Sequence, residues 1–258
     1  GGASQEKSQN VGSDPVVVFQ TTLVTMKLLA SDGTTELTSD NAHYYASGWK
    51  QFGDGTTTTN MELLPLTYTF RVSYGGASQE KSQNVGTDPT VIFQTTKVTL
   101  WFSGSIQYYA SGWKTFTKPS MELLPLTYTF RFLDTGHPAK EKSLSISGIL
   151  FERTVAYIRV LKSSGVGQSG VTATWWDYGG TKYPVPDSTD SNGVTLNFMD
   201  GKHTNVLICV TYQDATSPFK TQNPTTNSFY VWQMVSVTVQ LQDNTGAIIS
   251  GAAPVVYY

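Results

Sequence analysis

Residues 75–94 read GGASQEKSQNVGTDPTVIFQ, and residues 1–20 read GGASQEKSQNVGSDPVVVFQ. The first twelve residues of the two stretches are identical. A third, weaker form occurs at 220–233 (KTQNPTTNSFYVWQ), and a shortened one at 141–154 (EKSLSISGILFERT). The matching lysines are spaced 74, 61 and 78 residues apart, at Lys7, Lys81, Lys142 and Lys220. Self-similarity on this scale is typical of a modular array.

Each of these blocks is followed by a stretch in which every second residue is apolar, as in Val24, Met26 and Leu28. Such alternation is typical of a half-buried β-strand. The blocks therefore predict three whole modules, which we call the first repeat (16–95), the second repeat (96–153) and the third repeat (154–233). Residues 1–15 are expected to be the closing strand of a preceding module. Residues 234–258 are expected to be the opening hairpin of a following module.

Composition narrows the class of protein. Only 14% of the 258 residues are charged and the net charge is −2, with Lys and Arg scattered, so no nucleic-acid surface is expected. No apolar run approaches the ~20 residues of a membrane span. The chain has no initiator methionine or leader segment, which predicts a processed chain or part of a longer one. The single Cys209 lies in an apolar run and is expected to be a buried thiol.

The third repeat shows its strands most clearly. Alternating stretches at 155–161, 171–175, 194–198 and 206–212 are separated by turn sequences such as Asp190-Ser191-Asn192-Gly193. Short strands at this spacing predict an all-β fold made of immunoglobulin-like sandwiches. In the second repeat, the short Ser103-Gly104-Ser105 segment predicts a tight two-strand hairpin. We therefore expect the second repeat to be the shortest and least independent.

Three stretches resemble successive parts of one known module: VTVQLQDNTGAIISGAAPVV (237–256), TDSNGVTLNFMD (189–200) and LPLTYTFRVSY (64–74). The module is the prealbumin-like sandwich of carboxypeptidase regulatory-like and collagen-adhesin B-type repeats. The chain departs from that pattern at the corner glycine, which is Leu66 and Leu126 here. The resemblance implies tandem prealbumin-like sandwiches of a bacterial or archaeal surface protein, in a secreted or surface-bound stalk, adhesin or fibre.

Candidate chemistry is sparse, and we expect no catalytic and no cofactor-binding residues. The three histidines fall in different repeats and are expected to face solvent, and Glu62 and Glu122 occupy equivalent positions of two repeats rather than one site. The only candidate for a hard cation is a weak one in the DSTDSNG segment, where a plain turn is preferred. Its oxygen ligands would be Asp187, Asp190 and Asn192.

The resembled family also suggests intramolecular Lys–Asn isopeptide bonds assisted by a carboxylate. The corresponding trio here would be Lys27, Asn84 and Glu62. Lys27 alternates with Met26 and Leu28, which predicts that its side chain faces solvent. Such a bond needs a desolvated, neutral amine. We therefore expect no isopeptide bond at this position.

The aromatic residues are the better candidates for a contact or binding surface. Neighbours on one strand point to opposite faces, so some of these rings must be exposed. Exposed rings can form contacts between modules or subunits, or can stack on sugar rings. The residues concerned are Tyr44, Tyr45, Trp49, Tyr108, Tyr109, Trp113, Trp175 and Trp176.

Taken together, the residues favour a structural subunit of an extracellular fibre, stalk or surface layer, built by head-to-tail or strand-exchange contacts. The alternative is an extracellular carbohydrate-binding or adhesin array that uses exposed Tyr and Trp. Expected partners are copies of the chain or further modules, and in the alternative a surface polysaccharide. An enzyme, a cofactor, nucleic-acid binding and membrane insertion are not expected.

Overall fold

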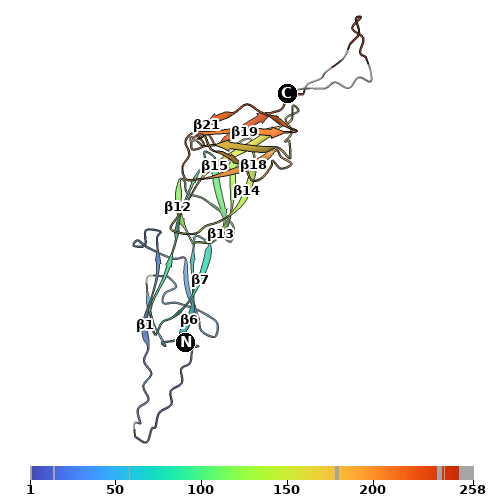
Figure 1. Cartoon of the computed structure of the whole chain (residues 1–258). Coiled ribbons are helices and arrows are strands. Elements are labelled where there is room, and N and C mark those ends of the chain that lie inside the picture. Colours follow the sequence, from blue (N-terminus) through green and yellow to red (C-terminus); the bar gives the residue numbers. More distant parts are fainter. Residues whose placement is uncertain are drawn as a thin grey trace. The chain divides into compact units, whose positions relative to one another are not determined.

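The computed structural model describes residues 2–13, 15–57, 59–177, 180–236, 240 and 242–249. All regular structure in these residues is β-strand, so the chain is all-β as predicted. Two compact units are present (Figure 1). The first unit contains Gly1–Leu100, Ile106–Phe132 and Glu141–Glu152, and the second contains Trp101–Ser105, Leu133–Lys140 and Arg153–Tyr258.

The first repeat forms two sheets. In one, β1 pairs antiparallel with β2 and β5 and parallel with β8. The other has the order β4-β3-β6-β7. The strands are β1 (Thr22–Leu29), β2 (Glu36–Leu37), β3 (Asn41–Tyr45), β4 (Trp49–Gln51), β5 (Asn60–Leu63), β6 (Thr67–Tyr74), β7 (Ala77–Asn84) and β8 (Thr90–Gln94).

Both sheets contribute side chains to one hydrophobic core. The alternation in β1 buries Val24, Met26 and Leu28, and β6 buries Phe70 against them. Phe93 of β8 belongs to the same core and is 3% exposed. The first repeat is thus a β-sandwich whose two inner faces interdigitate.

Residues 85–89 carry the chain from β7 in one sheet to β8 in the other. The amide nitrogen of Gly86 donates to Asn84 Oδ1 at 2.9 Å, and the Gln83 side-chain nitrogen donates to the Thr90 carbonyl at 2.9 Å. These two bonds fix the crossing from both sides. We call residues 77–94, two strands joined by this crossing, the arch.

The second repeat keeps the strand order of the first in one sheet, β11-β10-β13-β14. The tight hairpin predicted at Ser103-Gly104-Ser105 does not form: β9 pairs with β12, whereas β10 lies in the other sheet. Residues 102–104 therefore cross between sheets instead of making a tight turn. The strands are β9 (Thr96–Trp101), β10 (Ser105–Tyr109), β11 (Trp113–Thr115), β12 (Ser120–Leu123), β13 (Thr127–Asp134) and β14 (His137–Ser145).

The expected boundary between the second and third repeats, at 153–154, falls inside one long strand, β15 (Leu150–Leu161). The segment just before β15 pairs with β9, since the Lys97 nitrogen donates to the Ile149 carbonyl at 3.0 Å. The later part of β15 pairs antiparallel with β18. One continuous strand therefore ends one repeat and begins the next, with no linker between them.

In the third repeat, β15 pairs parallel with β22, as β1 does with β8. The second sheet has the order β17-β16-β19-β20, with β21 also paired to β19. Its strands enclose a core that includes Ile158, Ile208 and Tyr230. The remaining strands are β16 (Thr172–Trp176), β17 (Lys182–Pro184), β18 (Val194–Asp200), β19 (Val206–Tyr212), β20 (Ala215–Thr216), β21 (Lys220–Gln222) and β22 (Phe229–Gln233).

The closing strand expected at 1–15 does not form among residues 2–13, which have no strand. Its equivalent, β7, is a strand because it pairs with β6, and residues 2–13 have no such neighbour here. Of the opening hairpin expected at 234–258, the structure describes the turn, where Gln242 and Ile248 form an antiparallel bridge. The expected strand at 237–241 lies mostly outside the described residues.

The buried tyrosines make stability sensitive to alkaline pH. Burial raises the pKa of Tyr157 to about 12, and it also raises the pKa of Tyr128 and Tyr230. In the unfolded chain these hydroxyls titrate near pH 10, so the unfolded chain loses its protons first. The stability that the Tyr157 hydroxyl contributes is therefore fully present below pH 10 and is lost as the pH rises from 10 to 12, by at most about 1.4 kcal/mol per pH unit.

This dependence can be measured by denaturant unfolding from pH 8 to 12, with tyrosinate absorbance recorded in parallel. The Tyr157→Phe variant is expected to lose stability at pH 8, because it lacks the bond from the Tyr157 hydroxyl to the Pro138 carbonyl, 2.6 Å long. It should then decline less steeply than wild type above pH 10. Identical slopes for the two proteins would contradict the assignment.

Candidate functional site

The first and second repeats meet within the first unit through the side chain of Glu122. Its carboxylate accepts hydrogen bonds from the Ser31 hydroxyl at 2.7 Å and the Ser31 backbone nitrogen at 3.2 Å. The hydroxyl of Thr95, which is 1% exposed, donates to the same carboxylate at 2.5 Å. One side chain of the second repeat therefore binds both a loop and the last residue of the first. Thr95 and Thr96 leave no free linker, since both are buried.

The turn between β6 and β7 makes a second contact at this joint. The Tyr108 hydroxyl donates to the Gly75 carbonyl at 3.1 Å. A Cβ at Gly76 would overlap the Lys114 side chain and the Ala110 carbonyl, so this approach requires glycine. A Cβ at Gly2 would overlap the Ala46 carbonyl in the same way. Ala46 and Ala110 are equivalent, so Gly2 sits against the first repeat as Gly76 sits against the second.

Loops of the second repeat belong to the second unit, where they pack on the third repeat. His137 stacks on Phe229 with ring centroids 4.7 Å apart and planes at 14°. Ser103 and Ser228 exchange bonds, each backbone nitrogen donating to the other hydroxyl at 2.9 and 3.0 Å. The expectation that the histidines face solvent is wrong for His137, because the β13–β14 turn lies against Phe229. His43 and His203 are also only half-exposed.

Residues 3–20 repeat the internal bonds of the arch at 77–94. Lys7 Nζ donates to the Val18 carbonyl at 3.4 Å, as Lys81 Nζ does to Ile92. The Gln9 side chain donates to the Val16 carbonyl at 2.8 Å, as Gln83 does to Thr90. We call residues 3–20 the N-terminal arch; Figure 1 shows it as a dark-blue loop beyond β1 and β6.

The two arches differ in what covers them. Val85, Val91 and Phe93 of the arch at 77–94 are 0%, 0% and 3% exposed. Their equivalents in the N-terminal arch are 60%, 40% and 48% exposed; these are Val11, Val17 and Phe19. Nearly identical sequences with matching internal bonds thus present an apolar face that is buried in the first repeat and exposed in the N-terminal arch.

The aromatic residues divide as the alternation predicts. Tyr44 and Tyr108 are buried at 3% exposure, while Tyr45 and Tyr109 are half exposed. Trp49 is 36% exposed, and the Arg71 guanidinium lies 3.7 Å over its ring. The same arrangement recurs in the second repeat.

In the first and second repeats, these exposed groups form a cross-strand ladder on the outer face of one sheet. In the first repeat, Tyr45 packs edge-on against Trp49 at 5.5 Å, Arg71 covers the indole, and Glu80 binds Arg71 at 2.9 Å. The second repeat repeats it with Tyr109, Trp113, Arg131 and Glu141. Because the guanidinium occupies one face of each indole, the ladder ties the short edge strand to its sheet.

In the third repeat the tryptophan lies on the inner strand β16 and the cation on the edge strand β17, whereas in the first repeat the tryptophan lies on the edge strand β4. Trp176, paired with Lys182, lies edge-on to Phe219, with centroids 4.7 Å apart. The Lys182 ammonium lies 5.6 Å from the Trp176 ring. Trp175 is 9% exposed and stacks on Tyr183 at 4.5 Å.

The weak cation candidate is arranged as a turn. Asp190 Oδ1 accepts from the backbone nitrogens of Asn192 and Val194 at 2.9 and 3.0 Å, and Oδ2 accepts from Lys140 Nζ at 2.7 Å. Burial acts to raise the pKa of Asp190. The hydrogen bonds from Lys140 and from the backbone nitrogens outweigh it, so the pKa of this carboxyl is lowered. The Asp187 carbonyl accepts from the Thr195 hydroxyl. In the part of the chain that the structure describes, no three acidic, His or Cys side chains cluster as metal ligands.

The isopeptide trio is not brought together. Lys27 forms an ion pair with Glu36 on β2, and Asn84 Oδ1 caps the crossing at Gly86. Glu62 is exposed on β5. Cys209 is buried as predicted, and burial raises the pKa of its thiol.

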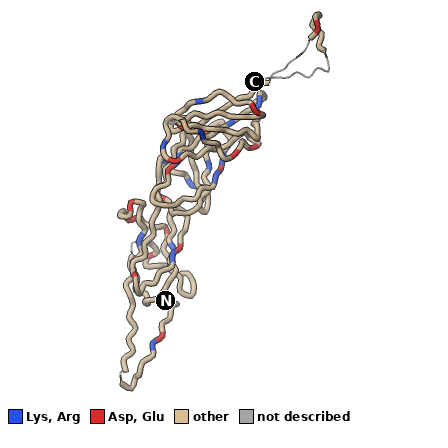
Figure 2. The backbone as a smooth tube through the Cα atoms, viewed as in Figure 1, with Lys and Arg blue, Asp and Glu red and all other residues tan. Residues whose placement is uncertain are grey.

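Charges of both signs are scattered along the chain (Figure 2). The described residues include no helix long and apolar enough to cross a membrane.

No family model and no curated protein sequence matches the chain. Solved structures with some similarity are pilin and adhesin domains of bacteria. The Bacillus anthracis TIE protein is 10% identical, with TM-score 0.24 over 83% of this chain, which spans about half (51%) of that protein. BcpA, the major pilin subunit of Bacillus cereus, is 8% identical, with TM-score 0.24 over 83% of this chain and 99% of BcpA.

A mutant of the shaft pilin SpaA from Lactobacillus rhamnosus GG is also 8% identical, with TM-score 0.28 over 85% of this chain and all (100%) of that one. TM-scores of this size do not indicate a shared fold over the whole length. The function is therefore argued from the residues of this chain.

Glu122→Ala is expected to destabilise the first unit by about 1–3 kcal/mol, because Ser31 loses its acceptor and the Thr95 hydroxyl keeps only the longer bond to the Leu29 carbonyl, at 3.3 Å. The matched control is Glu62→Ala, in the same MELLPL sequence but exposed, with an expected change within about 0.5 kcal/mol. Denaturant unfolding measures both. Equal losses for the two variants would show that Glu122 does not join the repeats.

Trp49→Ala is expected to cost about 1 kcal/mol, because Arg71 and Tyr45 lose the ring that they both contact. Trp113→Ala should cost a similar amount, since its ladder is the same. Thermal unfolding checks both values, and Arg71→Ala combined with Trp49→Ala should cost less than the sum of the two single changes. Strict additivity would contradict the ladder.

Proposed function

We propose that the chain is a structural segment of a surface or extracellular fibre, built as a tandem array of β-sandwiches. The N-terminal arch carries this proposal. It keeps the bonds of the arch at 77–94 but exposes the three apolar side chains that the first repeat buries there. An exposed apolar face of this kind is an association surface in water.

The occupant of that surface is a further sandwich of the same kind, lacking its own closing arch. The arch at 77–94 supports this choice of partner, because there β7 pairs with β6 and β8 pairs with β1. The two arches differ only at Ser13, Val16 and Val18, which are Thr87, Thr90 and Ile92 in the second. A groove shaped like that of the first repeat therefore accepts the N-terminal arch by strand addition.

The joints support the same function. The first joint binds two successive repeats through Glu122, Ser31 and Thr95, and Gly2 already occupies the position that Gly76 holds in that joint. Contact surfaces thus recur in register with the sequence repeat. A contact that repeats head to tail without closing into a ring extends as a filament.

The test places residues 22–74 directly ahead of Gly1, which recreates the order found at Tyr74–Gly75. In this extended chain the N-terminal arch should complete a new sandwich. Phe19→Asp should then cost more than about 3 kcal/mol, as expected of a buried phenylalanine. In the original chain the same change should cost less than about 0.5 kcal/mol.

Phe93→Asp is the matched control, since it occupies the equivalent buried position and should be strongly destabilising in both chains. A Phe19→Asp change that remains neutral in the extended chain would overturn the assembly of the arch into a sandwich. Surface location is tested separately by immunogold microscopy of native material. Label along filaments or at the cell surface is expected, and label confined to the cell interior would contradict the proposal.

A further inference from the structure

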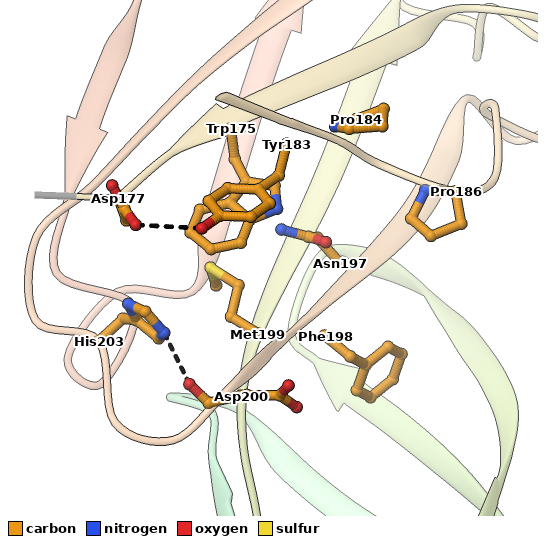
Figure 3. A pocket seen from close by; sticks show the side chains of 10 residues that line it. All are labelled: Trp175, Asp177, Tyr183, Pro184, Pro186, Asn197, Phe198, Met199, Asp200 and His203. Carbon is orange, nitrogen blue, oxygen red and sulfur yellow. Dashed lines mark hydrogen bonds between the residues drawn. The ribbon is translucent and has the colours of Figure 1, made fainter. Parts of the chain in front are cut away.

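The third repeat contains a cavity of about 400 Å³ at the open edge between its two sheets (Figure 3). Trp175 and Tyr183, from β16 and β17, form one wall as a stacked pair with planes at 19°. Asn197 and Met199 of β18 lie across from them, and His203 packs edge-on to Trp175 at 5.5 Å. A cavity of this size, with a few polar groups among aromatic walls, is typical of a small-ligand site.

The strongest indication of a ligand is the side chain of Asn197. It is 2% exposed, and its Nδ2 has no hydrogen-bond partner among the described residues. Figure 3 shows this nitrogen directed toward the Trp175–Tyr183 pair. A buried donor without an acceptor costs about 1–3 kcal/mol, so a ligand that supplies an oxygen acceptor here recovers that free energy.

Two carboxylates, those of Asp177 and Asp200, also line the cavity. Asp177 Oδ1 accepts from the Thr181 nitrogen at 2.9 Å and Oδ2 from the Tyr183 hydroxyl at 3.3 Å, which fixes the tyrosine ring. Asp177 has no cationic partner among the residues described. Asp200, by contrast, is bound to Arg153 at 2.7 Å, and its carbonyl is 2.7 Å from His203 Nε2. The cavity thus combines one free donor with one carboxylate of uncompensated charge.

We propose that this cavity binds one pyranose ring of a neutral polysaccharide. Sugar hydroxyls are both donors and acceptors, so one ring can accept from Asn197 Nδ2 and donate to Asp177. The C–H face of a pyranose is flat and apolar and matches the Tyr183 ring, which is 38% exposed and supported from behind by Trp175. The uncompensated Asp177 carboxylate disfavours sugars that carry a carboxylate of their own.

The site lies on Trp175 and Tyr183, not on the exposed ladder tryptophans. Trp49 and Trp113 each have one ring face covered by an arginine. The proposal is independent of fibre assembly, because every residue of the cavity belongs to the third repeat.

The test titrates the full chain with methyl glucopyranoside, methyl galactopyranoside and methyl mannopyranoside, read by tryptophan fluorescence and saturation-transfer NMR. We expect saturable binding of at least one, with transfer to the sugar C–H protons. Tyr183→Ala should weaken that binding about tenfold or more, since it removes the stacking surface. Tyr45→Ala, at an exposed tyrosine of the first repeat, is the matched control and should leave the affinity for the sugar unchanged.

Asn197→Asp replaces the donor with an acceptor of equal size and should abolish binding, with its fold checked by the unfolding midpoint. Glucuronate should bind at least tenfold more weakly than the best neutral glycoside. Phe19→Asp should bind like wild type, which separates this site from the arch. No saturable binding of any glycoside, binding unchanged by Tyr183→Ala, or stronger binding of glucuronate would overturn the proposal.

Discussion

The parallel pairing of the last strand of a repeat with its first strand organises the whole chain. In the first repeat, β8 pairs with β1, and in the third, β22 pairs with β15. Parallel neighbours cannot be joined by a short hairpin. The chain must therefore travel through the second sheet and return by the crossing that forms each arch, and the arch is where one sandwich is closed and the next begins.

This constraint explains why the joints are so short. Only Thr95 separates β8 of the first repeat from β9 of the second, and between the second and third repeats β15 continues without interruption. With no linker residues available, the neighbouring repeats must contact each other directly. Glu122 and the Ser103–Ser228 pair make these contacts. Each contact uses a serine that follows the first strand of its repeat: Ser31 follows β1, and Ser103 follows β9.

Much of the fold could be predicted from the sequence, because alternation identifies strands and their buried faces. The opposite exposure of the neighbours Tyr44 and Tyr45 follows directly from it, although which of the two is buried does not. Alternation does not identify the sheet to which a strand belongs, which is why β9 and β10 were expected to form a hairpin. Nor can local sequence distinguish Glu62 from Glu122: only the neighbouring repeat does. Asn197 lies within a stretch of regular alternation. That its side-chain nitrogen lacks a hydrogen-bond partner among the described residues can be seen only in the structure, where β16 and β17 of the other sheet lie across from it.

The register of β1 and β8 also decides how the first repeat responds to mechanical force. The chain enters β1 at Thr22 and leaves β8 at Gln94, and the two strands run parallel from the Thr25–Thr90 pair to the Leu29–Gln94 pair. Tension applied along the chain pulls these two strands lengthwise in opposite directions. All the ladder hydrogen bonds between them are then strained together rather than broken one after another. The covalent path of the chain thus places its strongest resistance to stretching across the two strands that begin and end the repeat.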